Sequence, residues 1–226
     1  MIALSKRLQC IANMVPPCAV LADVGTDHGY LPAWLLQSGR VERALASDVR
    51  PGPLQRAQET AETCDLTDRM ELTLADGLNY PGAERAQVIT ICGMGGETMI
   101  SILSAAPWAV DGRRLILQPQ SKLTELEDWL FSNSYAITDA RLCLDAGKYY
   151  LALSVLGGEQ GSVRAEDWLL RRRDPLAAAY FQREADKTAH ALDSLRQAAQ
   201  PRTDQSDALK RRLAALQNHL KETETW

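Results

Sequence analysis

The sequence of 226 residues lacks any long hydrophobic run, which bears first on where the protein works. No apolar stretch approaches the roughly 20 residues that a membrane-spanning helix needs. The first ten residues also lack the charged-then-apolar layout of a signal peptide. We therefore expect a soluble, cytoplasmic protein with no membrane partner. With 46% hydrophobic and 24% charged residues, the chain can bury one sizeable core and a small appendage.

Paired cysteines are missing as well. The five cysteines are odd in number, widely separated and never arranged as Cys-x-x-Cys. This pattern argues against both a disulfide framework and a zinc site. We expect reduced thiols and no metal.

The sequence has no surplus of positive charge. Its net charge is −4, and residues 1–160 hold 13 Lys/Arg against 19 Asp/Glu, whereas residues 161–226 hold 12 against 10. Bulk charge therefore provides no attraction to nucleic acid, and a polyanionic partner would have to meet a local basic patch. The basic groups concentrate in the C-terminal part.

What the sequence does contain is an apolar run that ends at Asp23, enters a turn with Gly25 and Gly29, and restarts as a helix at residues 31–37. This order is typical of the first strand, loop and helix of a nucleotide-binding α/β unit. Glycine permits positive φ and lets the backbone come close to a ligand. Asp27 occupies the place of the second glycine of a dinucleotide fingerprint, so the turn alone is equally consistent with a loop that binds nothing.

The alternation of strand, loop and helix continues along the chain. Apolar strands are predicted at residues 43–49, 70–77, 88–92 and 114–120, and helices at 4–15 and 51–64. Acidic residues or glycines stand at the carboxyl ends of these strands: Asp48 and Asp76-Gly77 end two of them, and Gly93-Met94-Gly95-Gly96 follows a third. Because the carboxyl ends of parallel strands meet at one edge of an open sheet, these residues predict a ligand crevice there.

The end of this region predicts two further strands, at residues 135–144 and 149–156, joined by the short turn Asp145-Ala146-Gly147-Lys148. Such a connection makes the two strands antiparallel to each other. A seven-stranded, mostly parallel sheet with an antiparallel last strand resembles the class I S-adenosylmethionine-dependent methyltransferases, a Rossmann-like α/β fold, rather than the all-parallel nicotinamide-binding sheet.

Residues 157–162 read as a linker, so we expect a sheet domain at 1–160 and a C-terminal domain at 161–226. Asp174-Pro175 predicts the start of a helix to about Gln200, and residues 201–204 a turn. Leu209, Leu213, Leu216 and Leu220 predict the apolar seam of a second helix. The C-terminal domain is therefore expected to be a coiled-coil-like α-helical hairpin.

Several of these segments together resemble the bacterial tRNA (adenine(22)-N1)-methyltransferase family, TrmK. The resemblance covers nearly the whole chain and includes Ser5-Lys6-Arg7-Leu8, Asp23-Val24-Gly25-Thr26-Asp27-His28-Gly29-Tyr30-Leu31-Pro32, Ser47-Asp48-Val49, Ala75-Asp76-Gly77, Ile91-Cys92-Gly93-Met94-Gly95-Gly96 and Gln118-Pro119-Gln120. It implies S-adenosylmethionine as methyl donor, tRNA as acceptor and no obligatory protein partner.

The resemblance also implies roles in donor binding. Gly25 and Gly29 would let the backbone approach the methionine part, and His28 and Arg7 would meet its carboxylate, although His28 could be an ordinary loop residue and Arg7 a solvated one. Asp23 is a further residue expected in donor binding. Asp48 would hold the ribose hydroxyls and Val49 the adenine ring, unless Asp48 only caps the next helix. Asp76 and Gly77 would meet the adenine amino group, and Gly93 and Met94 the transferred methyl.

The acceptor side is expected to use Asp27, Gln118 and Tyr30. Asp27 would stabilise the positive charge that develops on the adenine, or else simply cap a helix. Gln118 and Gln120 could read an adenine edge or form turns, and Tyr30 could stack on the base or be an ordinary helix aromatic. The Asp/Asn-Pro-Pro-Tyr/Phe signature of exocyclic amine methylation is absent after the fourth strand, which favours ring N1 over N6.

Basic side chains of the C-terminal part are candidates for phosphate binding: Arg171, Arg172, Arg173, Arg183, Lys187, Arg196, Arg202, Lys210, Arg211 and Arg212. Charged helix faces are often only solvated, so that alternative stays open. A nicotinamide-dependent oxidoreductase and a non-catalytic RNA-binding or regulatory protein are the rival functions.

Overall fold

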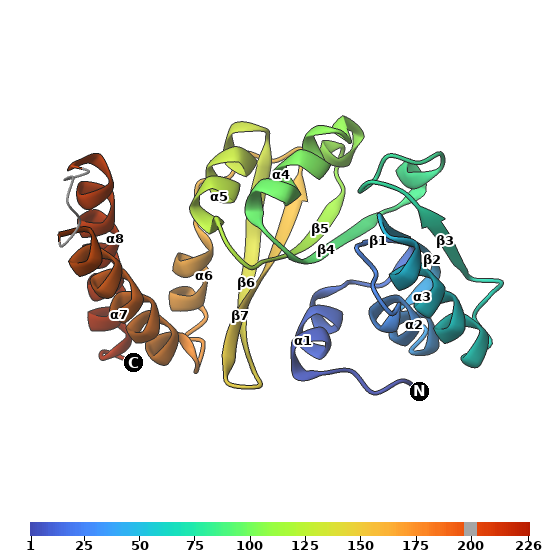
Figure 1. Ribbon diagram of the computed structural model, residues 1–226, viewed down its shortest axis with the longest axis horizontal. Helices are drawn as coiled ribbons and strands as arrows, with labels where there is room; N and C mark the ends of the chain where they lie inside the picture. The colour runs from blue at the N-terminus through green and yellow to red at the C-terminus, as the bar shows by residue number, and fades with distance from the viewer. Residues whose placement is uncertain (197–202) are drawn as a thin grey trace. The chain divides into compact units, whose positions relative to one another are not determined.

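The computed structural model describes residues 1–196 and 203–226 of the chain (Figure 1). The chain divides into two compact units, Met1–Ala165 and Glu166–Trp226. The second unit therefore begins at Glu166, whereas the sequence predicted a boundary at Gly161. The first unit contains α1 (Lys6–Met14), β1 (Cys18–Val24), α2 (Tyr30–Gln37), β2 (Val41–Asp48), α3 (Pro51–Thr63), β3 (Met70–Leu74), β4 (Val88–Met94), α4 (Gly96–Ser104), β5 (Arg114–Pro119), α5 (Leu123–Ser132), β6 (Tyr135–Asp145) and β7 (Lys148–Gly157), with short 3-10 turns at Ala83–Arg85 and Pro107–Val110.

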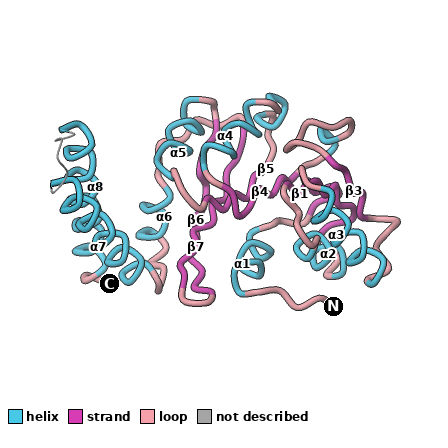
Figure 2. Tube along the Cα trace, in the orientation of Figure 1, coloured by secondary structure: helices cyan, strands magenta, loops and turns pink. Residues whose placement is uncertain are grey.

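The seven strands form one sheet in the order β3-β2-β1-β4-β5-β7-β6. Neighbours from β3 to β5 are parallel, whereas β7 is antiparallel to both β5 and β6. The predicted Rossmann-like methyltransferase fold is therefore confirmed. Figure 2 shows the strands as a continuous layer with helices on both sides.

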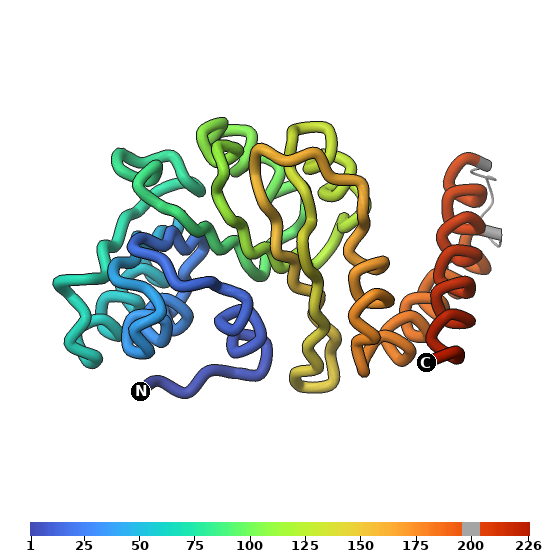
Figure 3. The backbone as a smooth tube through the Cα atoms, turned by 180° about the vertical axis from the view of Figure 1, so that it is seen from behind, coloured from blue at the N-terminus to red at the C-terminus, as the bar shows by residue number. Residues whose placement is uncertain are grey.

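Helices α1, α2 and α3 cover one face of the sheet and α4 and α5 the other, as the two opposite views show (Figures 1 and 3). The core under the first three helices is fully buried and consists of aliphatic residues such as Ile11, Leu21, Leu35 and Leu36. Burial of large aliphatic side chains contributes roughly 1.5–3 kcal/mol each and fixes the sheet edge that carries the site.

The residues directly before α1 and α2 determine how these two helices begin. The Ser5 hydroxyl accepts a hydrogen bond from the Leu8 amide and caps α1. Gly29 stands in the left-handed region, φ 68°, directly before α2. A Cβ at Gly29 would lie 2.6 Å from the Met70 side chain and 3.1 Å from Ala57, so this glycine serves close packing of α2 on α3 and β3.

The second unit contains α6 (Ala165–Arg171) except for its first residue, together with α7 (Ala177–Arg196) and α8 (Thr203–Thr223). Helix α6 was not predicted. The predicted capping by Asp174 is present, because its carboxylate accepts a hydrogen bond from the Leu176 amide, although α7 begins at Ala177, two residues later than predicted.

Within this unit α7 and α8 lie side by side as an antiparallel pair. Leu216 is fully buried, and Leu209, Leu213 and Leu220 are half-buried, in agreement with the predicted seam. The predicted helix end at Gln200 and the first two residues of the predicted turn, Pro201 and Arg202, lie outside the described residues, whereas Thr203 and Asp204 belong to α8 rather than to a turn. None of the described helices is both long and apolar enough to cross a membrane.

Candidate active site

A cavity of about 450 Å³ opens at the carboxyl ends of the central strands. Gly25 follows β1, Asp48 ends β2, Asp76 follows β3 and Gly93 lies in β4, and all four line this one cavity. The predicted residues that it brings together are Arg7, Gly25, Asp27, Asp48, Val49, Asp76, Gly77, Gly93 and Met94. The crevice expected from the strand ends is thus present.

Glycine is required at two positions of the wall. Gly25 has φ 70°, and a Cβ there would lie 2.2 Å from Cε of Met94. Gly93 has φ 78° beside a register shift in the β4–β5 pair, and its Cβ would lie 3.2 Å from the Arg7 guanidinium. Any other residue would be strained and would narrow the cavity.

Asp48 provides the buried carboxylate of the cavity, with 5% of its surface exposed. Its Oδ1 accepts a hydrogen bond from the Arg50 amide at 3.0 Å and its Oδ2 one from the Asp27 amide at 3.3 Å. A carboxylate has about four acceptor positions, so it retains capacity for ligand hydroxyls. The next residue, Val49, exposes 64% of its surface at the cavity wall, which is unusual for valine and leaves an apolar face available.

A smaller cavity of about 70 Å³ adjoins the first at Gly25. It contains Asp23 and His28 and also touches Arg7 and Asp27. Burial raises the pKa of Asp23 to about 6, although the hydrogen bond from the Thr90 hydroxyl, 2.6 Å long, opposes the shift. A buried carboxylate of this kind favours a cationic ligand group beside it.

Arg7 reaches both cavities from α1. Its guanidinium donates a hydrogen bond to Oε1 of Gln118 at 3.1 Å. The site thus places a cation and the Asp23 carboxylate around Gly25, a charge arrangement that suits a zwitterionic amino acid.

Asp27 lies at the mouth, where its side chain is 62% exposed and its backbone has φ 52°. Its Oδ1 lies 3.9 Å from the Arg56 guanidinium and 4.0 Å from Nε2 of His28. The rings of His28 and Tyr30 are stacked, with centroids 5.2 Å apart. Tyr30 is exposed and, like Asp27, lines the smaller cavity.

Two predicted site residues need correction. Gln118 lines neither cavity, because its side chain is 1% exposed and bonded to Arg7 and to the Pro119 carbonyl. It therefore does not present its amide to a base. Gly29 also lines neither cavity, since it packs against Ala57 and Met70 as described above.

Sequence reasoning missed other residues of the cavity wall. Arg50 lies beside Asp48, and Thr98 and Ile102 come from α4. Thr98 and Ile102 are four residues apart, so they share a helix face, and this spacing after the glycine-rich loop was the available signal. Gln120, named beside Gln118, is the glutamine that reaches the cavity.

The basic residues of the second unit have different surroundings. Arg212 forms a bidentate ion pair with the buried Glu166, with distances of 2.6 and 2.5 Å, and so connects α8 to α6. Its guanidinium is occupied by this pair, so Arg212 is no longer a candidate for phosphate binding. Lys210 pairs with Asp207, and the Arg171 guanidinium lies 5.2 Å from the centre of the Trp168 ring. Arg171, Arg172, Arg173 and Arg211 are exposed. In the described part of the chain, no group of three or more metal-ligating side chains could hold an ion.

Comparisons with known proteins agree with this geometry. A family model described as a methyltransferase domain matches residues 4–153. The tRNA (adenine(22)-N(1))-methyltransferase of Bacillus subtilis (strain 168) is 35% identical over 158 residues, which span 70% of this chain and 66%, just under two thirds, of that relative.

Two solved structures resemble nearly the whole chain. The B. subtilis m1A22 tRNA methyltransferase TrmK has 29% identity and a TM-score of 0.82, covering 97% of this chain and 100% of its own. Sp1610 of Streptococcus pneumoniae, solved in complex with S-adenosyl-L-methionine, has 32% identity and a TM-score of 0.83, covering 96% and 100%. The chain belongs to the methyltransferase domain family and, within it, to the bacterial tRNA (adenine(22)-N1)-methyltransferase family.

Proposed function

We propose that the protein transfers a methyl group from S-adenosylmethionine to N1 of adenine 22 in tRNA. The observation that carries this proposal is the single cavity lined by Gly25, Asp48, Asp76 and Gly93. Family membership supports it, and no feature of the cavity favours a nicotinamide. The methyl donor supplies an activated sulfonium methyl, so the protein has to bind, align and shield rather than activate.

The adenosine half of the donor fits the wall around β2 and β3. Asp48 would accept hydrogen bonds from the two ribose hydroxyls, and Val49 would pack on one face of the adenine. Asp76 would accept from the adenine amino group, with Gly77 beside it. Gly77 has φ 62°, and a Cβ there would lie 2.9 Å from Ile102, so this wall is closely packed.

The methionine half fits the charged groups around Gly25. Arg7 would bind its carboxylate and Asp23, ionised near neutral pH, would face its ammonium group. Gly25 and Gly93 let the backbone approach the chain that joins these charges to sulfur, and Met94 would pack a polarisable thioether near the methyl group.

The acceptor needs little acid–base help. Adenine N1 carries an unprotonated lone pair at neutral pH, so alignment of N1, methyl and sulfur provides most of the rate acceleration. Positive charge then moves onto the adenine ring. Asp27, at the mouth of both cavities, would stabilise that charge and accept a hydrogen bond from N6. The exposed Tyr30 would stack on the base.

The site also constrains the state of the tRNA. N1 lies on the Watson–Crick edge, so the target adenine has to be unpaired or turned out of its stack before transfer. We infer that exposed arginines of the second unit, Arg171, Arg172, Arg173 and Arg211 among them, bind phosphates and position the tRNA. A cytoplasmic location, where tRNA is modified, stays a prediction.

The test is methylation of unmodified tRNA transcripts by the full-length protein with S-adenosylmethionine, followed by nucleoside mass spectrometry and primer extension. We expect 1-methyladenosine and an extension block at position 22, and no product from a transcript with guanosine at that position. N6-methyladenosine, or a block elsewhere, would contradict the proposal. A protein that binds the donor but never turns over would support the non-catalytic alternative.

A further inference from the structure

Arg7 comes from α1, an element outside the sheet, yet its side chain borders both cavities. A long, flexible arginine on a nine-residue helix is not held in place by its own backbone. Its position in the site must therefore depend on contacts with other elements.

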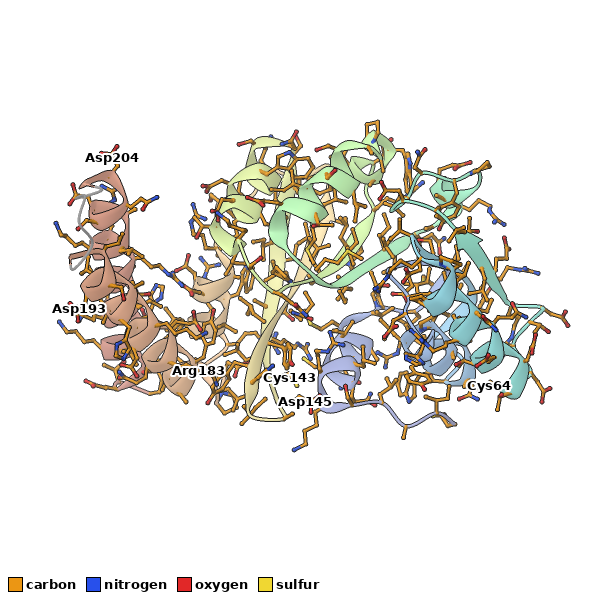
Figure 4. The ribbon with its side chains drawn as sticks, in the orientation of Figure 1. Cys64, Cys143, Asp145, Arg183, Asp193 and Asp204 are labelled. Carbon is orange, nitrogen blue, oxygen red and sulfur yellow. The ribbon has the colours of Figure 1, made fainter. Side chains whose placement is uncertain are left out.

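Three groups from distant parts of the chain meet Arg7. Oε1 of Gln118 in β5 accepts a hydrogen bond from its guanidinium at 3.1 Å. The ring of Tyr150 in β7 lies 5.5 Å from its guanidinium carbon. Asp145 at the β6–β7 turn, labelled in Figure 4, accepts a hydrogen bond from the Arg7 amide at 3.2 Å, which also satisfies a free amide of the first turn of α1.

Gln118 is itself held firmly. Its side chain is nearly inaccessible to solvent, and its Nε2 donates a hydrogen bond to the Pro119 carbonyl at 3.1 Å, which turns Oε1 toward Arg7. Residue 118 pairs with Cys92 across the β4–β5 register, directly before Gly93. The Gln118 side-chain amide therefore holds the Arg7 guanidinium beside Gly93, where β4 lines the cavity.

The two groups that meet the guanidinium itself, Gln118 and Tyr150, are both uncharged. A glutamate at position 118 would form an ion pair with Arg7 and compete with a ligand carboxylate for its charge. An amide oxygen and an aromatic face orient the guanidinium without forming an ion pair with it.

We infer that Gln118 and Tyr150 are positioning residues, which hold Arg7 ready for the carboxylate of the donor's methionine part. This inference rests on the proposed function. It assigns Gln118, first expected at the acceptor base, to the methionine end of the donor. It predicts a selective effect, because a ligand without the amino-acid carboxylate gains nothing from an oriented Arg7.

The test compares binding of two probes to the full-length protein by isothermal titration calorimetry. S-adenosylhomocysteine carries the carboxylate, and 5′-methylthioadenosine keeps the adenosine and sulfur but lacks the amino acid. We expect Gln118→Leu to weaken S-adenosylhomocysteine binding about tenfold, the equivalent of one charge-assisted hydrogen bond, and to change 5′-methylthioadenosine binding less than about twofold. Gln118→Glu should show the same selectivity, because it neutralises Arg7.

Tyr150 offers a matched pair of variants. Tyr150→Phe keeps the aromatic face and should bind both probes as the wild type does, whereas Tyr150→Leu should lose affinity for S-adenosylhomocysteine alone. In an Arg7→Ala background, Gln118→Leu should have no further effect, because the group it positions is gone.

The outcomes separate this inference from the proposed function. Equal loss of both probes in Gln118→Leu, no loss of either, or full additivity with Arg7→Ala would overturn the positioning role. A wild-type protein that binds neither probe would overturn the proposed function, and this inference with it.

Discussion

The amide of Asp27 donates a hydrogen bond to the Asp48 carboxylate, 3.3 Å from nitrogen to oxygen. This contact joins the turn after β1 to the end of β2, so the residue proposed to face the acceptor is held by the residue proposed to hold the ribose. Because Asp27 has a positive φ, its turn is under local strain and depends on such contacts. Under the proposed function, donor binding and acceptor alignment would therefore share one carboxylate.

The first prediction concerns Asp48→Ala. The change removes the acceptor for the ribose hydroxyls and frees the amides of Asp27 and Arg50, so S-adenosylhomocysteine should bind at least about tenfold more weakly by calorimetry. Glu59→Ala, an exposed carboxylate on α3, is the control and should bind normally. Undiminished affinity in Asp48→Ala would remove this residue from the donor site.

The second prediction concerns Asp27→Asn, which keeps the shape of the side chain and removes its charge. Single-turnover methylation of tRNA should slow by about tenfold or more, because a charge that stabilises the developing cation is lost. S-adenosylhomocysteine affinity should stay within about twofold, since the backbone contact to Asp48 remains. The control is Asp68→Asn, which is exposed on the loop before β3. Unchanged turnover would exclude Asp27 from the mechanism.

The third prediction is a pH dependence of donor binding. Asp23 has its pKa raised to about 6 by burial, so in the free protein it is neutral below that pH and ionised above it. A ligand ammonium favours the ionised form, so S-adenosylhomocysteine affinity should rise as pH increases through about 6 and then level off. 5′-Methylthioadenosine, which lacks the ammonium, should show no such rise, and Asp23→Asn should abolish it.

The same shift has a consequence for stability. Because the folded-state pKa is above the unfolded one, Asp23 favours folding below its ordinary pKa, and that contribution is lost as pH rises through about 6. The Tm of Asp23→Asn relative to that of the wild type should therefore increase as pH rises from about 4 to 7. A pH-independent difference would contradict the assignment.

The fourth prediction separates a structural arginine from exposed ones. Arg212→Leu leaves the buried Glu166 without its bidentate partner and should lower the unfolding free energy of the second unit by about 3 kcal/mol in chemical denaturation. Arg211→Leu, one position earlier and exposed, should change it by less than about 0.5 kcal/mol. Equal effects would show that the Glu166–Arg212 pair contributes no special stability.

The fifth prediction concerns tRNA binding. Replacing Arg171, Arg172 and Arg173 together by Gln should weaken tRNA binding in filter or fluorescence assays. The salt dependence of log K should fall by up to about one unit for each phosphate that the variant no longer binds. S-adenosylhomocysteine affinity should be unaffected. An unchanged salt slope would mean that these arginines bind no phosphate.

Local patterns were sufficient to predict the sheet and the cavity at its edge. Alternating strands and helices, with Asp48, Asp76 and Gly93 at or near the carboxyl ends of strands, predicted the crevice because the carboxyl ends of parallel strands converge. The hairpin turn at Asp145 likewise predicted the antiparallel β6 and β7.

The failures have a common physical cause in long-range contacts. Gln118 looked like a residue for the ligand, but its partner Arg7 lies 111 positions away in sequence. Gly29 looked like a ligand glycine, yet its missing Cβ serves packing on Ala57. Arg212 looked solvated or phosphate-bound because Glu166, 46 positions earlier, is brought to it only by folding.

A crystal structure of the protein with S-adenosylhomocysteine tests the central claim most directly. The account predicts ligand density in the cavity between Gly25 and Asp76, with the ribose hydroxyls on Asp48 and the carboxylate on Arg7. Density with the ligand reversed, so that the carboxylate lies at Asp48, or a cavity left empty at saturating ligand, would contradict it.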